Sequence, residues 1–396
     1  MTASLLCETI AGDTMADLMA ARERAAAADL LEMRLDGVRD LDVAQALHGR
    51  HAPVIATCRP AWEGGRFNGS EEERRTLLSS ALALGADYVD LEWRALEPFE
   101  SLRVAPIKVE ERHAQGGVGF SDLLRANGPR VIVSSHDFAG VPDDLGARGR
   151  AMRSIGAAVI KVAVTPTRLS DTLALREIAK EGDAVVVGMG DAGVPTRLLA
   201  SRFGSRWTYG GNGVAPGQMP AARMLEQFRF RTVGASTAVY GVVGHHVMRS
   251  VSPVMHNAAF AAAGLDAVCV PLCAADFADF LMFADALGIV GAGVTVPFTL
   301  DALRASTRSD DLTRRVGAVD TIRRAHGGWE ATIADAAGVV DPTEAASGNV
   351  DSVAGLVAQA ERQFEWWTGR APAQGVMRAA ALAETGHRDT EARRDT

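Results

Sequence analysis

The sequence has few cysteines and no excess of positive charge, and each shortage excludes a class of protein. Four cysteines in 396 residues do not fit a disulfide framework. Cys269 and Cys273 have no histidine or cysteine partner at zinc-finger spacing, so buried thiols, no metal and a cytoplasmic location are expected. A net charge of −8 argues against nucleic acid or an anionic membrane surface as a partner.

Signals for secretion or membrane insertion are also missing. Residues 1–4 have neither a basic region nor an apolar stretch, so no signal peptide is expected. The most apolar region, 258–290, is too often interrupted by charge to span a membrane. The interrupting residues are Asp266, Asp276, Asp279 and Asp285.

The first 233 residues contain eight short apolar runs, separated mostly by helical stretches. The runs are Ser4–Glu8, Leu30–Leu35, Val54–Cys58, Tyr88–Leu91, Arg130–Val133, Val159–Val164, Ala184–Met189 and Trp207–Tyr209. They are continuous rather than alternating, which is typical of strands buried on both faces. The pattern predicts an α/β fold with a (β/α)8 TIM barrel over residues 1–233.

A second βα pattern begins near Tyr240 and predicts a smaller α/β domain over residues 238–375. Strands are expected at 238–243, 267–271 and 291–296, with helices between them. The last residues, 379–396, are rich in polar and charged side chains, and we predict a disordered tail over residues 376–396.

Polar residues cluster at the C-terminal ends of the predicted barrel strands. They are Glu32, Arg34, Arg59, Glu92, His136 and Arg197, with Lys161 inside the sixth run. In a TIM barrel these ends converge on the mouth where active sites form. A polar side chain inside an apolar strand costs several kcal/mol unless it is paired or used.

Lys161 and His136 are the strongest candidates for catalysis. Burial disfavours the ammonium form of a lysine, which makes the amine nucleophilic toward a carbonyl. His136 follows the adjoining strand and can act as general base, and Glu92 can orient its imidazole. Alone, the lysine would be a strand-end side chain and the histidine a structural one. Their convergence favours catalysis.

Six short segments resemble class I 3-dehydroquinate dehydratases, in the same order and with similar spacing. They are Glu32-Met33-Arg34-Leu35-Asp36, Ser134-Ser135-His136-Asp137-Phe138, Ile160-Lys161-Val162-Ala163, Gly188-Met189-Gly190 through Thr196-Arg197, Phe203-Gly204-Ser205 and Ala215-Pro216-Gly217-Gln218.

The resemblance implies a Schiff-base lyase that converts 3-dehydroquinate to 3-dehydroshikimate in the shikimate pathway, without a cofactor. Lys161 would form the imine, His136 would move the protons, and Glu92 would orient His136. The substrate would be bound by Glu32, Arg34, Arg59, Arg197 and Gln218. Val214 replaces a small hydroxyl residue usual in the family, at a cost of about 0.5–1.5 kcal/mol in binding.

The second half resembles the substrate-binding half of shikimate dehydrogenases. The resemblance rests on Ser250-Val251-Ser252-Pro253, His256-Asn257, Val294-Thr295-Val296-Pro297-Phe298, Gly317-Ala318-Val319 and a closing helix near 356–369. It implies a vestigial shikimate site made of Ser250, Ser252, Asp335 and Gln359.

Three departures affect this second resemblance. Thr299 and Asp320 stand where the family has lysine and asparagine, and Ile333-Ala334-Asp335 replaces Asn-Thr-Asp. Twelve residues separate Gly338 from Asp351, whereas a βαβ nucleotide-binding unit needs ~30. We therefore expect dehydrogenase activity to be absent. A bifunctional enzyme and a non-catalytic quinate sensor remain alternatives, and a homodimer is compatible with the sequence.

Overall fold

The computed structural model describes residues 4–96, 120–211, 213, 216–334 and 353–392. The chain divides into two compact units. One comprises Ser4–Pro166 and Ala174–Ala222, and the other comprises Thr167–Leu173 and the chain from Arg223 onward. Residues 223–233, which we assigned to the barrel domain, therefore group with the second unit.

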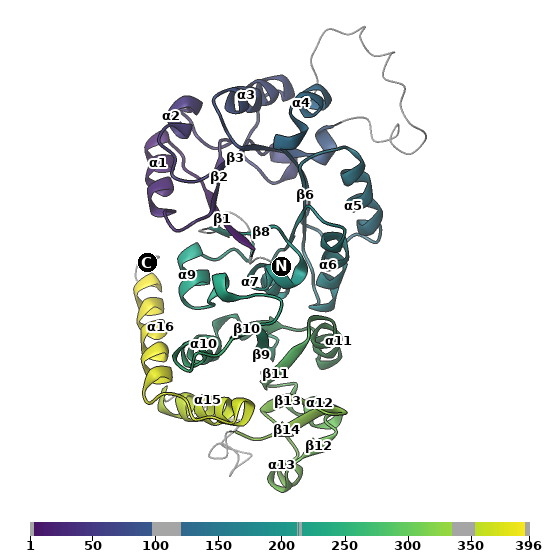
Figure 1. Ribbon diagram of the computed structural model, residues 1–396, viewed down its shortest axis with the longest axis vertical. Coiled ribbons are helices and arrows are strands. Elements are labelled where there is room, and N and C mark those ends of the chain that lie inside the picture. The colour runs from purple at the N-terminus through teal and green to yellow at the C-terminus, as the bar shows by residue number, and fades with distance from the viewer. Residues whose placement is uncertain (1–3, 97–119, 212, 214–215, 335–352, 393–396) are drawn as a thin grey trace. The chain divides into compact units, whose positions relative to one another are not determined.

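Eight parallel strands form a nearly closed barrel in the first unit (Figure 1). The strands are β1 (Leu5–Ile10), β2 (Leu30–Arg34), β3 (Val54–Thr57), β4 (Tyr88–Glu92), β5 (Val131–Asp137), β6 (Val159–Val164), β7 (Ala184–Gly188) and β8 (Trp207–Gly211). Consecutive strands pair from β1 to β7, and β8 pairs with β1. At the remaining edge Arg206 N donates to Ala184 O at 2.9 Å. The predicted TIM barrel is confirmed.

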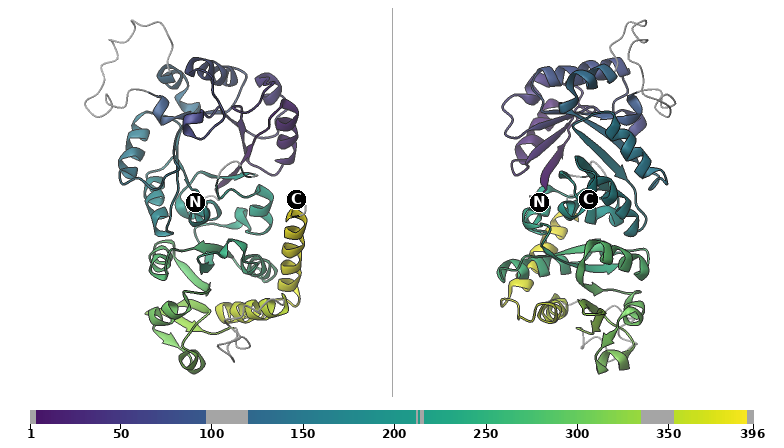
Figure 2. Two further views of the ribbon diagram at one scale, coloured as in Figure 1. Left: turned by 180° about the vertical axis from the view of Figure 1, so that it is seen from behind. Right: turned by 45° about the vertical axis from the view of Figure 1, so that its right-hand side comes forward.

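Helices lie on the outer side of the barrel strands (Figures 1 and 2). They are α1 (Met15–Arg24), α2 (Val43–Leu47), α3 (Glu71–Ala83), α4 (Phe120–Asn127), α5 (Leu145–Ser154), α6 (Leu173–Lys180), α7 (Val194–Leu198) and α8 (Ala200–Phe203). Helix α9 (Ala221–Glu226) spans the boundary, since its residues from Arg223 onward group with the second unit. Helix α3 begins with a capping box, in which Ser70 Oγ accepts from Glu73 N and Glu73 Oε2 accepts from Ser70 N.

The second unit is built on a mixed six-stranded sheet in the order β10-β9-β11-β13-β14-β12. The strands are β9 (Ala238–Gly244), β10 (Ala267–Cys273), β11 (Ile289–Val294), β12 (Arg308–Ser309), β13 (Thr321–Ala325) and β14 (Gly328–Thr332). The helices are α10 (Ser252–Ala262), α11 (Phe277–Leu287), α12 (Thr299–Ala305), α13 (Asp311–Val316), α15 (Val353–Thr368) and α16 (Val376–Ala392).

Helix α15 is joined to strand β13 by side chains one helical turn apart. Gln359 donates to Asp320 Oδ2 at 3.0 Å, Gln363 to Thr321 Oγ1 at 3.0 Å, and Trp367 Nε1 to Ile322 O at 3.1 Å. The spacing of four residues places all three on one face of the helix. Phe260 and Phe364 fill the core between α10 and α15.

The predicted disordered tail is wrong for most of its length. Residues 376–392 form α16, and Met377 and Ala381 are buried in the core that includes Phe260 of α10. The charged residues from Glu384 onward drew attention away from the mostly apolar residues 376–383, in which Met377 and Ala381 lie four residues apart on one helical face. Residues 393–396 lie outside the described residues.

All four cysteines are buried and free, as the sequence predicts. Among the described helices, none is both long and apolar enough to cross a membrane. The described residues also contain no cluster of three or more histidine, cysteine or acidic side chains that could hold a metal ion.

The burial of α16 gives a first test. Met377→Ala should lower the free energy of unfolding by about 2–5 kcal/mol, because Met377 is fully buried. Leu382→Ala is the matched control on the same helix, and its half-exposed side chain should change stability by no more than about 0.5 kcal/mol. Urea unfolding of both variants measures this, and equal small effects would mean that α16 is not packed in solution.

Candidate functional site

A pocket lies within the barrel unit and contains most of the predicted site residues. Its lining consists of Thr9, Glu32, Arg34, Arg59, Glu63, Gly64, His136, Phe138, Lys161, Ala163, Val187, Met189, Arg197, Tyr209, Pro216 and Gln218. Seven of the eight side chains predicted for the dehydratase site are in this set. Glu92 is the exception.

Lys161 is buried in the pocket between two carboxylates and an aromatic ring. Its Nζ lies 2.8 Å from Glu32 Oε1 and 3.1 Å from Asp90 Oδ2. The same nitrogen lies 4.2 Å from the centre of the Tyr209 ring. The ammonium is therefore compensated by charge, and by a ring face that attracts cations. Glu32 is fixed in turn by hydrogen bonds from Thr9 and Thr57, at 2.9 and 3.2 Å.

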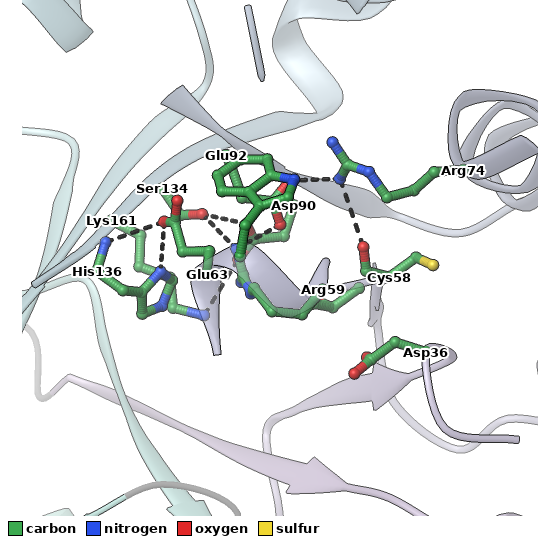
Figure 3. A network of polar contacts seen from close by, with 12 residues as sticks. Asp36, Cys58, Arg59, Glu63, Arg74, Asp90, Glu92, Ser134, His136 and Lys161 are labelled. Atoms are coloured by element: carbon green, nitrogen blue, oxygen red, sulfur yellow. Dashed lines mark hydrogen bonds and ion pairs between the residues drawn. The ribbon is translucent and has the colours of Figure 1, made fainter. Parts of the chain in front are cut away.

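The carboxylate of Asp90 begins a buried chain of alternating charges (Figure 3). Arg59 Nη2 lies 3.0 Å from Asp90 Oδ2, and Arg59 Nη1 lies 2.6 Å from Glu92 Oε1. Ser134 Oγ donates to Asp90 Oδ1 at 2.5 Å. The other oxygen of Glu92 accepts from Arg74 of helix α3. Burial by itself raises the pKa of Asp90, but Arg59 and Lys161 hold it well below its usual value.

His136 is oriented by Glu63. Oxygen Oε1 of Glu63 lies 3.0 Å from His136 Nδ1 and accepts from the His136 backbone N–H, also at 3.0 Å. Burial lowers the pKa of the imidazole well below its usual value, and Arg59 and Lys161 lower it further. A neutral ring that donates from Nδ1 carries its lone pair on Nε2, which is the arrangement that a general base needs.

The contact that we predicted between Glu92 and His136 does not form. Strand register gives the reason. Glu92 pairs with Ser134, and Ser134 pairs with Lys161, so these three residues lie in one row across β4, β5 and β6. His136 lies two residues further along β5, opposite Ala163. Both oxygens of Glu92 are engaged by Arg59 and Arg74.

Glu63 reaches His136 because the chain folds back after strand β3. Phe67 N donates to Arg59 O at 3.1 Å and Ala61 N to Phe67 O at 3.0 Å, which closes a loop around Glu63. A Cβ at Gly65 would lie 2.0 Å from Arg59 O, so this position requires glycine. Burial raises the pKa of the Glu63 carboxyl to about 7, although Arg59 opposes the shift.

Arg197 is the cation of the pocket that has no carboxylate partner among the described residues. Its guanidinium donates to the carbonyls of Tyr209 and Pro216 at 3.2 and 3.3 Å. Its Nε is buried without a hydrogen-bond partner in the described part of the chain, and burial lowers the pKa of the group to about 10. Arg34, by contrast, is paired bidentately with Asp36 at 2.8 and 2.7 Å. Arg197 is thus the group best suited to receive a ligand carboxylate.

Gln218 is linked to Lys161 through a series of hydrogen bonds. Its Nε2 donates to Thr9 Oγ1 at 3.1 Å, and Thr9 donates to Glu32. Val214, whose replacement of a hydroxyl residue we predicted to weaken binding, lies outside the described residues.

The sequence interpretation missed Glu63, Asp90 and Arg74. Asp90 could have been found, because it lies two residues before Glu92 in a buried strand and so faces the same side. Two consecutive glycines after Glu63 indicate a tight turn that could present that carboxylate. Arg74 carried no comparable signal, since it lies in a helix rich in charged residues.

The residues predicted for a shikimate site are placed only in part. Ser250 and Ser252 lie at the start of α10, and Ser250 Oγ accepts from Ser252 N at 3.2 Å. Gln359 is bonded to Asp320, as described above. Asp335 lies outside the described residues.

Comparison with known proteins matches the barrel to one family. Residues 6–235 match the family described as Type I 3-dehydroquinase. The chain belongs to this family. Two further regions, 242–322 and 356–382, match the substrate binding domain and the C-terminal domain of shikimate dehydrogenases, respectively.

Two relatives illustrate how this chain compares with known members of the family. The bifunctional 3-dehydroquinate dehydratase/shikimate dehydrogenase of Arabidopsis thaliana is 31% identical over 335 residues, which cover 81% of this chain and 53% of the relative. The chain thus spans about half the length of that protein. The 3-dehydroquinate dehydratase of Methanothrix thermoacetophila is 35% identical over 209 residues, which cover 52% of this chain and 82% of the relative.

The environment of Glu63 predicts a pH dependence of stability. Its pKa is raised from 4.5 to about 7, so between these values the folded state holds a proton that the unfolded state has lost. Stability gained from this group is complete below pH ~4.5 and is lost as the pH rises through 7. Glu63→Gln should therefore gain about 3 kcal/mol relative to the wild type across this window.

Urea unfolding at a series of pH values measures the difference. Glu72→Gln is the control, because Glu72 is exposed on helix α3. A constant difference between wild type and Glu63→Gln from pH 4 to pH 8 would contradict the prediction.

Proposed function

We propose that the barrel is a 3-dehydroquinate dehydratase that works through an imine on Lys161. The observation that carries this proposal is that a buried amine and a neutral imidazole line one pocket, on the adjoining strands β6 and β5. The relative from Methanothrix thermoacetophila, of which this chain covers 82%, is named a 3-dehydroquinate dehydratase.

The pocket offers a complementary group for each part of this substrate. Arg197 would bind the carboxylate, because its guanidinium is buried and no carboxylate neutralises it within the described residues. Gln218, which also lines the pocket, would help to bind the carboxylate and a nearby hydroxyl. Glu32, Arg34 and Arg59 would bind the hydroxyl groups, since each presents a fixed charged hydrogen-bonding group to the cavity.

The chemistry needs one nucleophile and one proton carrier. The unprotonated amine of Lys161 attacks the C3 ketone, and the resulting carbinolamine takes up a proton and loses water to give a protonated imine that acidifies the C2 proton. His136 removes that proton, and the electron pair is delocalised into the imine. The imidazolium then protonates the departing C1 hydroxyl, which leaves as water, and hydrolysis of the imine releases 3-dehydroshikimate and regenerates Lys161.

Glu63 supports the proton carrier rather than contacting the substrate. When His136 takes the C2 proton, a positive charge develops on a ring whose surroundings lower its pKa. An ionised Glu63 carboxylate 3.0 Å from Nδ1 stabilises that charge. Since its pKa is about 7, the carboxylate is present increasingly above neutral pH.

Reductive trapping tests the imine. Borohydride added with 3-dehydroquinate should attach the substrate skeleton to Lys161, and Lys161→Ala should lose turnover by at least about 10³-fold. The sequence has three lysines, so mass spectrometry can assign the label, and Lys180→Ala is the control because Lys180 is exposed on α6. Normal turnover in Lys161→Ala would exclude the mechanism. Substrate binding without turnover or label would favour the sensor.

We propose in addition that the second unit has no dehydrogenase activity. Thr299 offers no ammonium group, and the carboxylate of Asp320 is bonded to Thr321, Ala334 N and Gln359. The described residues of this unit form a single sheet, and the gap between Gly338 and Asp351 is shorter than one βαβ unit. These residues do not fit NADP.

The alternative is a bifunctional enzyme like the Arabidopsis relative. Shikimate-dependent reduction of NADP by the full chain discriminates between the two. We expect no reduction above the rate without shikimate, measured by absorbance of the reduced nucleotide. A rate that depends on both shikimate and NADP would establish the bifunctional alternative.

A further inference from the structure

Arg74 is a buried cation that does not line the pocket. It lies on helix α3, and its side chain is 0% exposed. Its guanidinium donates to Glu71 Oε2 at 3.0 and 2.6 Å, to Cys58 O at 3.4 Å, and to Glu92. Together these acceptors hold the guanidinium in a single orientation. None of the three acceptor residues lines the pocket.

Glu92 connects Arg74 to the pocket. Its second oxygen lies 2.6 Å from Arg59, which lines the pocket and also donates to Ser134 at 2.8 Å. Arg59 lies 3.0 Å from Asp90, and the same Asp90 oxygen lies 3.1 Å from Lys161. Four contacts of alternating sign therefore run from α3 to the amine (Figure 3).

The ionised form of the buried Glu92 carboxyl is stabilised by both of its cations, Arg59 and Arg74. Burial raises the pKa of its carboxyl even in the presence of Arg59 and Arg74, which oppose the shift. Loss of Arg74 would make protonation of Glu92 easier still. Among its salt bridges, Arg59 would then be left with Asp90 alone, and the positive charge that Glu92 no longer balances would disfavour the nearby ammonium of Lys161.

We propose that Arg74 is a positioning residue for Lys161, and that it acts through Glu92, Arg59 and Asp90. Its effect on turnover rests on the proposed dehydratase function. Its effect on the reactivity of the amine does not, so the two ideas can fail separately.

The pH dependence of amine reactivity tests the proposal directly. Formaldehyde with borohydride methylates unprotonated amines, and mass spectrometry of the Lys161 peptide follows one of only three lysines. We expect the pH of half-maximal labelling to fall by about one unit in Arg74→Met, because the ammonium loses compensation. Glu92→Gln should produce a similar fall. Arg75→Met is the matched control, since Arg75 is next on α3 and pairs with Glu72 instead.

A double-mutant cycle distinguishes this route from general loosening of the barrel. If Arg74 acts through Glu92, adding Arg74→Met to Glu92→Gln should move the midpoint little further. Additive shifts, or an unchanged midpoint in both single variants, would overturn the proposal.

Arg74→Lys addresses the case in which Arg74→Met does not fold. Lysine keeps the charge but cannot make the forked contacts with Glu71 and Glu92 together, so its midpoint should lie between those of wild type and Glu92→Gln. A midpoint equal to that of wild type, with Glu92→Gln also unshifted, would again overturn the proposal. Labelling shifts in a protein without dehydratase turnover would support the proposal while the proposed function fails.

Discussion

The alternation of charge around Lys161 is the constraint on which the site depends. Each buried ion costs several kcal/mol to remove from water, so none of these groups is stable in isolation. Asp90 separates Lys161 from Arg59, and Glu92 separates Arg59 from Arg74. Removing Asp90 or Glu92 would leave neighbouring cations without the carboxylate between them, and removing Lys161 or Arg74 would leave the adjacent carboxylate with one cation instead of two. The barrel must therefore supply all of these residues together, from β4, β6, α3 and the segment that follows β3.

The barrel and the core of its site could be predicted from the sequence because both follow from one rule. Continuous apolar runs separated by helices form a parallel barrel, and its strand ends meet at one mouth. That rule placed Lys161, His136, Arg197 and Glu32 in one pocket without any knowledge of register. This reasoning uses only the strand that carries each residue, so it cannot predict which side chains contact one another.

Contacts that depend on strand register or on loop conformation could not be predicted from the order of the strands. Glu92 was assigned to His136 from strand order, but pairing with Ser134 places it in the row of Lys161. Glu63 lies outside the strands, in a loop closed by hydrogen bonds between Arg59, Ala61 and Phe67. Helix α16 was missed for a related reason, since two buried positions in a polar segment show only once the partner α10 is known.

In the second unit, Asp320 stands where the resemblance led us to expect an asparagine, and its carboxylate has a structural role. A carboxylate can accept hydrogen bonds but, unlike an amide, cannot donate one. At Asp320 the acceptor sites receive the hydroxyl of Thr321 at 2.6 Å, the N–H of Ala334 at 2.8 Å and the amide of Gln359 at 3.0 Å. Gln359, the residue expected to contact shikimate, thereby anchors α15 to the sheet. A polyol entering here would have to compete with these bonds, which favours a scaffolding role for this part of the unit.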